Sequence, residues 1–209
     1  LAAINSFFSF IGREELKVKQ LKIQRRPYCP KKKELTKAEY LRLVEAAKRQ
    51  ENTKLSLLLQ TLCGTGIRVS ELKFITVEAV LTGEAVIQMK GKSREILIAG
   101  RLQKTLRDYI RKNGLLAGPV FITKGGKPLD RSNVWKMMKA LCGSAQVDPH
   151  KVFPHNLRHL FARTFYSLDK DLAKLADLLG HSSINTTRIY IISSGQEHRK
   201  RLDALGLVL

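Results

Sequence analysis

The sequence predicts a mainly helical (mainly α, α+β) domain with one small antiparallel sheet. From residue 36 onward, most of the chain places apolar residues at the three- and four-residue spacing of helices. Between about residues 77 and 100 this spacing gives way to short β-rich runs separated by TGE and GKS. With 44% apolar residues among 209, the chain is long enough for one domain with a real core.

Residues 1–33 differ from the rest. A helix is expected in LAAINSFFSFIGREEL, with Ile4, Phe7, Phe8 and Ile11 at helical spacing, and a basic, proline-containing linker follows it. One helix cannot bury its own apolar face. We therefore expect this segment to be the end of a preceding domain, and expect the chain to start inside a larger protein.

The predicted main domain covers residues 34–209. It begins with a helix capped by Thr36 and Glu39, the two residues of a capping box. A buried helix, NTKLSLLLQTLCGTG, follows and ends at glycine, and IRVSELKF begins another. The β-rich runs then predict a three-stranded antiparallel sheet, followed by a helix that ends at Gly114.

The second half of this domain is predicted to be helical after one hairpin-like excursion, PVFITKGGKPL. Asp130 or Ser132 opens the next helix, and three more follow in HNLRHLFARTFYSL, DLAKLADLLG and SINTTRIYI. The tail has apolar residues that predict a short helix. Periodicity alone favours its folding back on its own domain.

The charge points to the partner. Lys and Arg total 38 against 18 acidic residues, which gives a net charge of +20 spread along the whole chain. A polyanion, most commonly nucleic acid, is the expected partner, and a merely soluble basic protein is the alternative. No apolar run is long enough to span a bilayer, so no membrane is expected.

The cysteines indicate the compartment. Cys29, Cys63 and Cys142 are odd in number and form no C-x-x-C pair, so neither a disulfide framework nor a zinc site is indicated. A reducing, cytoplasmic setting fits best. Carboxylates are sparse, and none cluster as a pair of Mg²⁺ ions would need, so we expect no metal and no cofactor.

The segment PHNLRHLFARTF carries the first candidate site. His155, Arg158 and His159 lie at i, i+3 and i+4 and so share one helix face, which suggests an anion site. The H-x-x-x-H spacing resembles a zinc-protease motif, but Asn156 stands where that motif needs its glutamate.

Two further candidates lie upstream. Arg68 follows GTGI, with Glu71 three residues later, a pair that is also common on helix surfaces. Lys92 lies in GKS, which is not a phosphate-binding loop because Val86 replaces its first glycine and a strand follows. Lys92 in a β-turn would still reach an anion.

Tyr190 stands among isoleucines, where packing is its commonest role. A phosphodiester reaction, however, needs a nucleophile, charge neutralisation on the two non-bridging oxygens, and a proton for the leaving group. Tyr190 would supply the first, Arg68 and Arg158 the second, and Lys92 or a histidine the third.

In their order, the motifs GIRVSEL, GK, HNLRH and LGH, with a tyrosine nine residues after the last histidine, resemble the tyrosine recombinase (phage integrase) family. The resemblance runs from about Leu35 to Ile191 and implies the family's catalytic fold, preceded by the last helix of a core-binding domain. The implied catalytic residues are Arg68, Lys92, His155, Arg158, His181 and Tyr190, with Glu71 and His159 in support. The turn GKSREI is short for the family, so Lys90 and Arg94 remain alternatives to Lys92.

The resemblance implies a site-specific recombinase from a mobile genetic element or a host system, acting in the cytoplasm on the nucleoid of a prokaryote. It would cleave and rejoin double-stranded DNA through a 3′-phosphotyrosine, without metal or ATP, as a homotetramer whose tails are exchanged between protomers. The alternatives are relaxation of DNA like that of a type IB topoisomerase, and a non-catalytic DNA-binding protein of the same fold.

Overall fold

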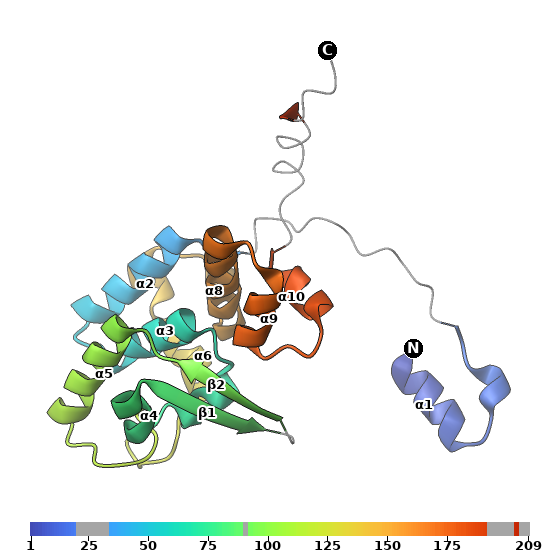
Figure 1. Cartoon of the computed structure of the whole chain (residues 1–209), viewed down its shortest axis with the longest axis horizontal. Helices are drawn as coiled ribbons and strands as arrows, with labels where there is room; N and C mark the ends of the chain where they lie inside the picture. The colour runs from blue at the N-terminus through green and yellow to red at the C-terminus, as the bar shows by residue number, and fades with distance from the viewer. Residues whose placement is uncertain (20–33, 90–91, 192–202, 205–209) are drawn as a thin grey trace.

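A computed structural model describes residues 1–19, 34–89, 92–191 and 203–204 (Figure 1). The α-helices are α1 (Ala2–Phe10), α2 (Lys37–Arg49), α3 (Thr53–Thr65), α4 (Val77–Thr82), α5 (Gly100–Lys112), α6 (Arg131–Ala140), α7 (Cys142–Ala145), α8 (Pro154–Asp169), α9 (Leu172–Leu179) and α10 (Ile184–Ile191). The 3₁₀ helices are η1 (Glu14–Leu16), η3 (Val69–Phe74) and η4 (Pro149–Lys151), and the strands are β1 (Glu84–Met89) and β2 (Lys92–Leu97).

The helix α3 forms the centre of the core. It packs against α2, α5 and α8, and its residues Leu57, Leu58 and Leu59 are all buried. Three consecutive buried leucines mean that the helix is covered all round, as its apolar composition predicts. Its last turn leads through Gly66, which has a φ of 64° and ends the helix. The first predicted arginine, Arg68, is therefore fixed to the most buried element of the domain.

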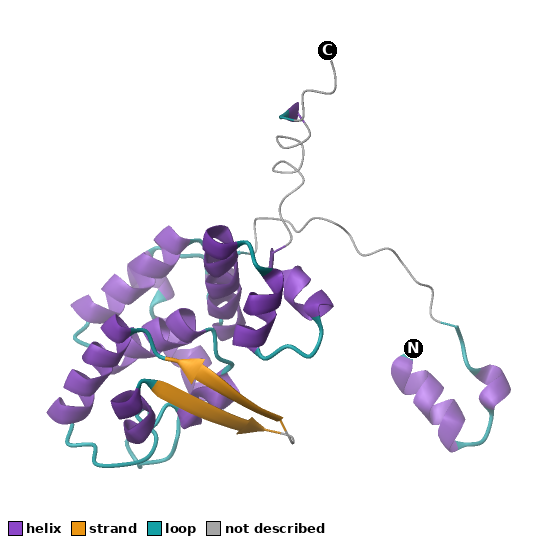
Figure 2. Cartoon of the chain, in the orientation of Figure 1, coloured by secondary structure: helices purple, strands orange, loops and turns teal. Residues whose placement is uncertain are grey.

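The described residues contain a two-stranded sheet, and the prediction of three strands is wrong. β1 and β2 are antiparallel, with Glu84 opposite Leu97 and Met89 opposite Lys92 (Figure 2). The first of the three β-rich runs forms the helix α4.

The sequence around α4 explains this difference. The Thr76 side chain accepts a hydrogen bond from the amide of Ala79, so it caps the helix, and Gly83 ends the helix with a φ of 91°. Val77 and Val80 lie one helical turn apart and are both buried. The stop and start signals at the ends of this run outweigh the strand preference of its valines.

The other predicted elements are confirmed in outline. Thr36 and Glu39 form the capping box of α2, and Asp130, not Ser132, caps α6. The stretch after Gly118 has the predicted hairpin-like form, with an isolated bridge between Ile122 and Pro128. The segment that begins with IRVSELKF forms the short 3₁₀ helix η3.

A second, smaller apolar cluster joins α8, α9 and α10. Ala162, Leu175, Leu179 and Tyr190 are buried together there, and Phe161 packs against them. The three helices lie side by side in Figure 1, next to α3. This cluster brings the tyrosine of α10 to the face of α8 that carries the two histidines and the arginine.

The N-terminal helix α1 leaves its apolar face exposed. Ile4, Phe7 and Phe10 are 50%, 57% and 88% exposed, and Asn5 exchanges two hydrogen bonds with the backbone of Val18. The predicted linker lies mostly outside the described residues, as does the tail helix apart from residues 203–204. Of the helices described, none is long and apolar enough to cross a membrane.

Candidate active site

Arg158 is the centre of the site and is almost fully buried, at 1% exposure. It extends from α8, where Pro154 occupies the first turn. Its Nη1 donates to the carbonyl of Gly66 at 2.6 Å, and its Nη2 donates to the carbonyl of Leu179 at 2.7 Å. One side chain therefore ties the end of α3 to the end of α9.

One donor of the Arg158 guanidinium has no hydrogen-bond partner among the described residues. A guanidinium carries five N–H donors, and the Nε of Arg158 is buried without a hydrogen-bond partner among the described residues. Burial, followed by the charge of Arg68, lowers the pKa of Arg158 to about 10, so it still carries its charge at neutral pH. A buried cationic donor without an acceptor is costly, and an anion would satisfy it.

His181 accepts a hydrogen bond from the same arginine. Its Nε2 lies 2.8 Å from Nη2 of Arg158, and its Nδ1 lies 2.8 Å from Oγ1 of Thr187. Arginine only donates, so Nε2 must be unprotonated and Nδ1 carries the proton toward Thr187. Burial, then the charges of Arg158 and Arg68, lower the pKa of His181 to about 4. His181 is therefore neutral at neutral pH.

Arg68 forms the more open end of the site. Its side chain is 45% exposed, and its Nη1 donates to Oε1 of Glu71 at 2.9 Å. The amide of Arg68 donates to the other oxygen of Glu71 at 2.7 Å. Burial raises the pKa of Glu71, but the amide of Arg68 and the charge of Arg94 outweigh it, so the pKa is lowered and the carboxylate stays charged.

Arg94 binds two acceptors within the site. Its Nη2 lies 2.5 Å from Oε2 of Glu71, its Nη1 donates to the carbonyl of Leu178 at 2.6 Å, and its side chain is 14% exposed. Both terminal nitrogens of this alternative to Lys92 are thus engaged by other groups. Lys92 begins β2, but its side chain and the whole of Lys90 lie outside the described residues. The assignment of Lys92 therefore stays a prediction.

Tyr190 is buried, at 7% exposure, and three imidazoles surround its ring. The ring centroid lies 4.3 Å from that of His159, 5.4 Å from that of His181 and 5.5 Å from that of His155. The Cζ atom of Arg158 lies 6.0 Å from the same centroid. A tyrosine that only filled the core would have apolar neighbours on all sides.

The two histidines of α8 share one face, as predicted. Their rings meet edge to face with centroids 4.8 Å apart. Burial lowers the pKa of His159 to about 4, with a further contribution from His155. Burial and then the charges of Arg158 and Arg68 also lower the pKa of His155. Neutral imidazoles, which are proton acceptors, therefore face the tyrosine at neutral pH.

The charges of the site favour an anion. Three arginines lie close enough to shift the pKa values of neighbouring groups: Arg68, Arg94 and Arg158. Glu71 supplies the carboxylate that Arg68 and Arg94 share. Positive charge thus exceeds negative charge among the described side chains of the site. Paired guanidiniums suit a phosphate, which they bind through charge-assisted hydrogen bonds. No cluster of three potential metal ligands occurs in the described part of the chain.

Two features of the site were not predicted from the sequence. Thr187 accepts a hydrogen bond from Nδ1 of His181, and Arg94 binds Glu71. Thr187 lies six residues after His181 and three before Tyr190, which places it on the tyrosine's helix. Nothing in that spacing marked it as different from Thr186. The sequence suggested Arg94 only as an alternative to Lys92 as the proton donor.

The described residues form a mainly helical domain in which a buried arginine, Arg158, lies beside a buried tyrosine, Tyr190. The profile of the Phage integrase family matches residues 33–197, and the chain belongs to this family. It is similar to the tyrosine recombinase XerD of Xanthomonas axonopodis pv. citri, with 34% identity over 162 residues that cover 70% of this chain and 53% of that protein. The tyrosine recombinase XerA of Pyrococcus furiosus is 28% identical over 215 residues, which cover 99% of this chain and 72% of that protein.

Solved structures share the fold. The post-cleavage complex of the XerH site-specific recombinase with a palindromic difH substrate has a TM-score of 0.75 and 23% identity, and the match covers 96% of this chain and 62% of that one. The crystal structure of the XerA recombinase has a TM-score of 0.71 and 24% identity, and the match covers 97% and 73% of the two chains. The chain spans about half the length of the XerD and XerC proteins that it matches, at 53% and 55%.

Proposed function

We propose that the chain is the catalytic part of a site-specific DNA recombinase that cleaves and rejoins strands through a 3′-phosphotyrosine. One observation carries this proposal: Tyr190 is buried against three imidazoles and beside Arg158, whose buried Nε has no acceptor among the described residues. The similar proteins XerD and XerA are tyrosine recombinases, which supports the proposal over the relaxing and the non-catalytic alternatives.

The proposed chemistry is a transesterification. The phenol oxygen of Tyr190 attacks phosphorus and forms the tyrosyl–phosphate bond, while the bond to the 5′ oxygen of the strand breaks. A phenol is a poor nucleophile until it gives up its proton, and the neutral imidazoles of His155 and His159 lie beside the Tyr190 ring as acceptors for it. Arg68 and Arg158 stabilise the charge that develops on the non-bridging oxygens. Lys92, or Lys90 in its place, gives the 5′ oxygen its proton. The phosphodiester energy is retained, so the reverse attack rejoins strands.

Double-stranded DNA is the proposed substrate. The net charge of +20 supports a polyanionic partner, and several solved structures of the same fold are complexes of recombinases with DNA. Because phosphate contacts dominate such binding, affinity should fall steeply with salt. We place this activity in the cytoplasm, on the nucleoid.

The proposed division of the chain is a helix and linker, 1–33, before a catalytic domain, 34–209. Two contacts support a boundary near residue 34: Leu35 is fully buried, and Glu34 forms an ion pair with Arg163 of α8. The exposed apolar face of α1 supports its assignment to a preceding core-binding domain, because packing against further helices would cover this face.

The test is to trap the covalent intermediate on a nicked DNA substrate from which the cleaved fragment diffuses away. The parent protein should form a protein–DNA adduct that survives denaturation and does not require added metal, and Tyr190→Phe should bind the DNA but form none. An adduct formed by Tyr190→Phe would refute the assignment. Relaxation of supercoiled DNA without exchange between two sites would instead favour the topoisomerase-like alternative.

The tetramer and the tail exchange form a separate part of the proposal. The tail, most of which lies outside the described residues, carries Leu202, Leu205, Leu207 and Val208 on an otherwise charged segment. We propose that it docks on a neighbouring protomer in a DNA-bound homotetramer. Deletion of residues 197–209 should leave binding to a single site intact and weaken pairing of two sites. Recombination at the parent rate by the truncated protein would contradict the docking.

A further inference from the structure

Arg94 connects three segments of the site that are far apart in the sequence. It extends from β2, two residues after Lys92. Its Nη2 binds Oε2 of Glu71 at 2.5 Å, and its Nη1 donates to the carbonyl of Leu178 near the end of α9 at 2.6 Å. Arg94 therefore contacts the hairpin, the segment of Arg68 and the turn that leads into His181.

Gly180 lets Arg94 lie directly against the backbone of α9. A Cβ atom at Gly180 would clash with Cδ of Arg94 and would lie 2.7 Å from its Nε, and the residue has a φ of +63°. Both facts require glycine at this position. The glycine of the LGH motif thus ends the helix and also makes room for the arginine.

Two arginines cap the end of α9 through neighbouring carbonyls. Arg94 binds the carbonyl of Leu178, and Arg158 binds that of Leu179. Positive charge at a helix C-terminus is favourable, because the last carbonyls are unpaired and the helix dipole is negative there. The position of His181, which follows this turn, therefore depends on both arginines.

Glu71 is also divided between two arginines. One of its oxygens binds Nη1 of Arg68, and the other binds Nη2 of Arg94. Without Arg94, Oε2 of Glu71 would keep the backbone amide of Arg68 as a donor but would have room for a second donor, the guanidinium of Arg68. A bidentate pair would then hold Arg68 more strongly and draw it away from an anion.

We infer that Arg94 is a positioning residue, which holds the β1–β2 hairpin, Glu71 with Arg68, and the C-terminal turn of α9 in one arrangement. It thereby fixes β2, the strand that begins at Lys92, to which the proposed function assigns the proton donor. Its planar guanidinium binds two acceptors in two directions, which the single ammonium of a lysine does not reproduce. This inference rests on the proposed function.

The test compares two nicked DNA substrates, one ordinary and one with sulfur in place of the 5′ bridging oxygen. A thiolate leaves without prior protonation, because thiols are far more acidic than alcohols. Arg94→Gln and Arg94→Lys should form the adduct about 100-fold more slowly than the parent on the ordinary substrate, the range typical of lost general acid catalysis. On the sulfur substrate, most of this defect should disappear.

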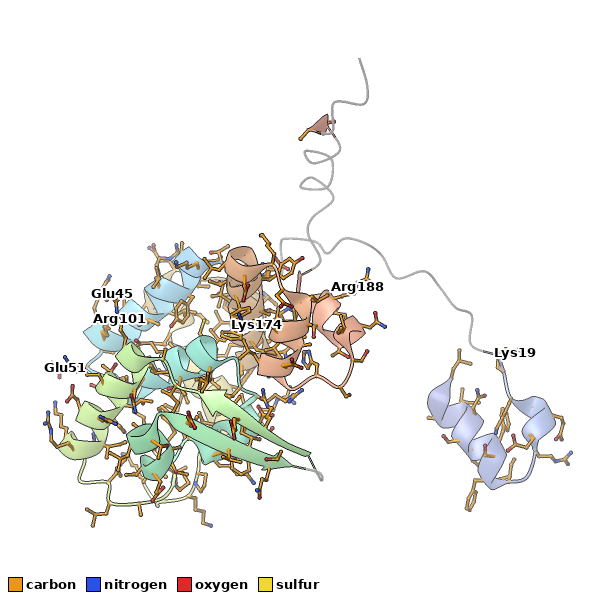
Figure 3. The ribbon with its side chains drawn as sticks, in the orientation of Figure 1. Lys19, Glu45, Glu51, Arg101, Lys174 and Arg188 are labelled. Carbon is orange, nitrogen blue, oxygen red and sulfur yellow. The ribbon has the colours of Figure 1, made fainter. Side chains whose placement is uncertain are left out.

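The matched control is Arg101→Gln, which removes the same charge from an exposed position on α5, on the side of the domain away from α10 (Figure 3). It should cleave both substrates at the parent rate. The Arg68→Lys variant should be slow on both substrates, because the phosphate clamp is needed whichever group leaves. Equal slowing of an Arg94 variant on both substrates would mean that Arg94 acts only through the phosphate clamp, and would overturn its positioning of the hairpin.

A second measurement does not depend on catalysis. In ¹H–¹⁵N spectra of Arg94→Gln, amide signals should shift in three separate segments, 68–72, 84–97 and 178–182, and stay unchanged in α2. Shifts confined to β2 would overturn the inference. If the parent forms no adduct with DNA, the proposed function fails, and these spectra still decide the placement of Arg94.

Discussion

The two arginines of the site are held in opposite ways. Arg158 is buried and bonded to Gly66, Leu179 and His181, so it belongs to the structure that joins α3, α8 and α9. Arg68 is nearly half exposed, and its side chain is held by Glu71. The buried end is therefore preorganised by the fold, whereas the open end keeps donors that face solvent. Preorganised charge needs little rearrangement when the transition state forms.

The largest effect is expected for Arg158→Lys. Lysine does not replace a guanidinium that bonds to two carbonyls and an imidazole. Adduct formation should fall by about 10³-fold, as when a preorganised donor is lost, and the free energy of unfolding should fall by about 1–3 kcal/mol because buried acceptors lose their partner. A single-turnover cleavage assay measures the rate of adduct formation, and denaturant unfolding measures the free energy of unfolding. A variant with both parent stability and parent rate would show that the buried end is not preorganised by Arg158.

Arg68→Lys should separate the two effects. Cleavage should fall by about 10²-fold, because the planar pair of donors is lost. Stability should change by less than about 1 kcal/mol, because the ion pair is partly exposed and solvent screens it. DNA affinity should change little, since many other basic residues contribute to it. Destabilisation as large as that of Arg158→Lys would remove the distinction between the two ends.

Acid should lower the free energy of unfolding mainly through the histidines near Arg158. The pKa of His181 is about 4 in the folded protein against an ordinary value of 6.5. Between these values the unfolded chain binds a proton that the folded protein does not, so the free energy of unfolding decreases as pH falls through this window. His159, with the same pKa, acts in the same sense. His181→Gln should therefore lose less stability than the parent between pH 6.5 and 4. Parallel curves for the two proteins would contradict the neutral state of His181.

The smallest effect is expected for Thr187→Val. Thr187 is fully buried and its Oγ1 accepts a hydrogen bond from Nδ1–H of His181, and valine has nearly the same shape as threonine. Loss of one hydrogen bond should lower the free energy of unfolding by about 1 kcal/mol. The same loss in the transition state would slow cleavage about fivefold. Thr186→Val, at an exposed neighbouring position, is the control. A Thr187→Val variant as active as the control would show that this hydrogen bond does not orient His181.

Much of this site was predictable because its residues have local signals. Arg158 and the histidines of α8 lie at helical spacing, and the order of the motifs identified Arg68, His181 and Tyr190. The sheet was predicted with one strand too many, because the valines of α4 favour strands. The prediction did not take account of Thr76 and Gly83, which cap the two ends of that helix. The roles of Arg94 and Thr187 were not predictable, because each depends on a contact that only the folded chain makes. Arg94 reaches Leu178 across 84 residues.

The most direct test of the account identifies the residue that carries the DNA. The covalent complex of the parent protein would be digested with nuclease and protease and analysed by mass spectrometry. The account predicts a nucleotide attached to Tyr190, within the peptide that contains α10, and no adduct in Tyr190→Phe. A nucleotide on any other side chain, or an adduct that persists in Tyr190→Phe, would contradict it.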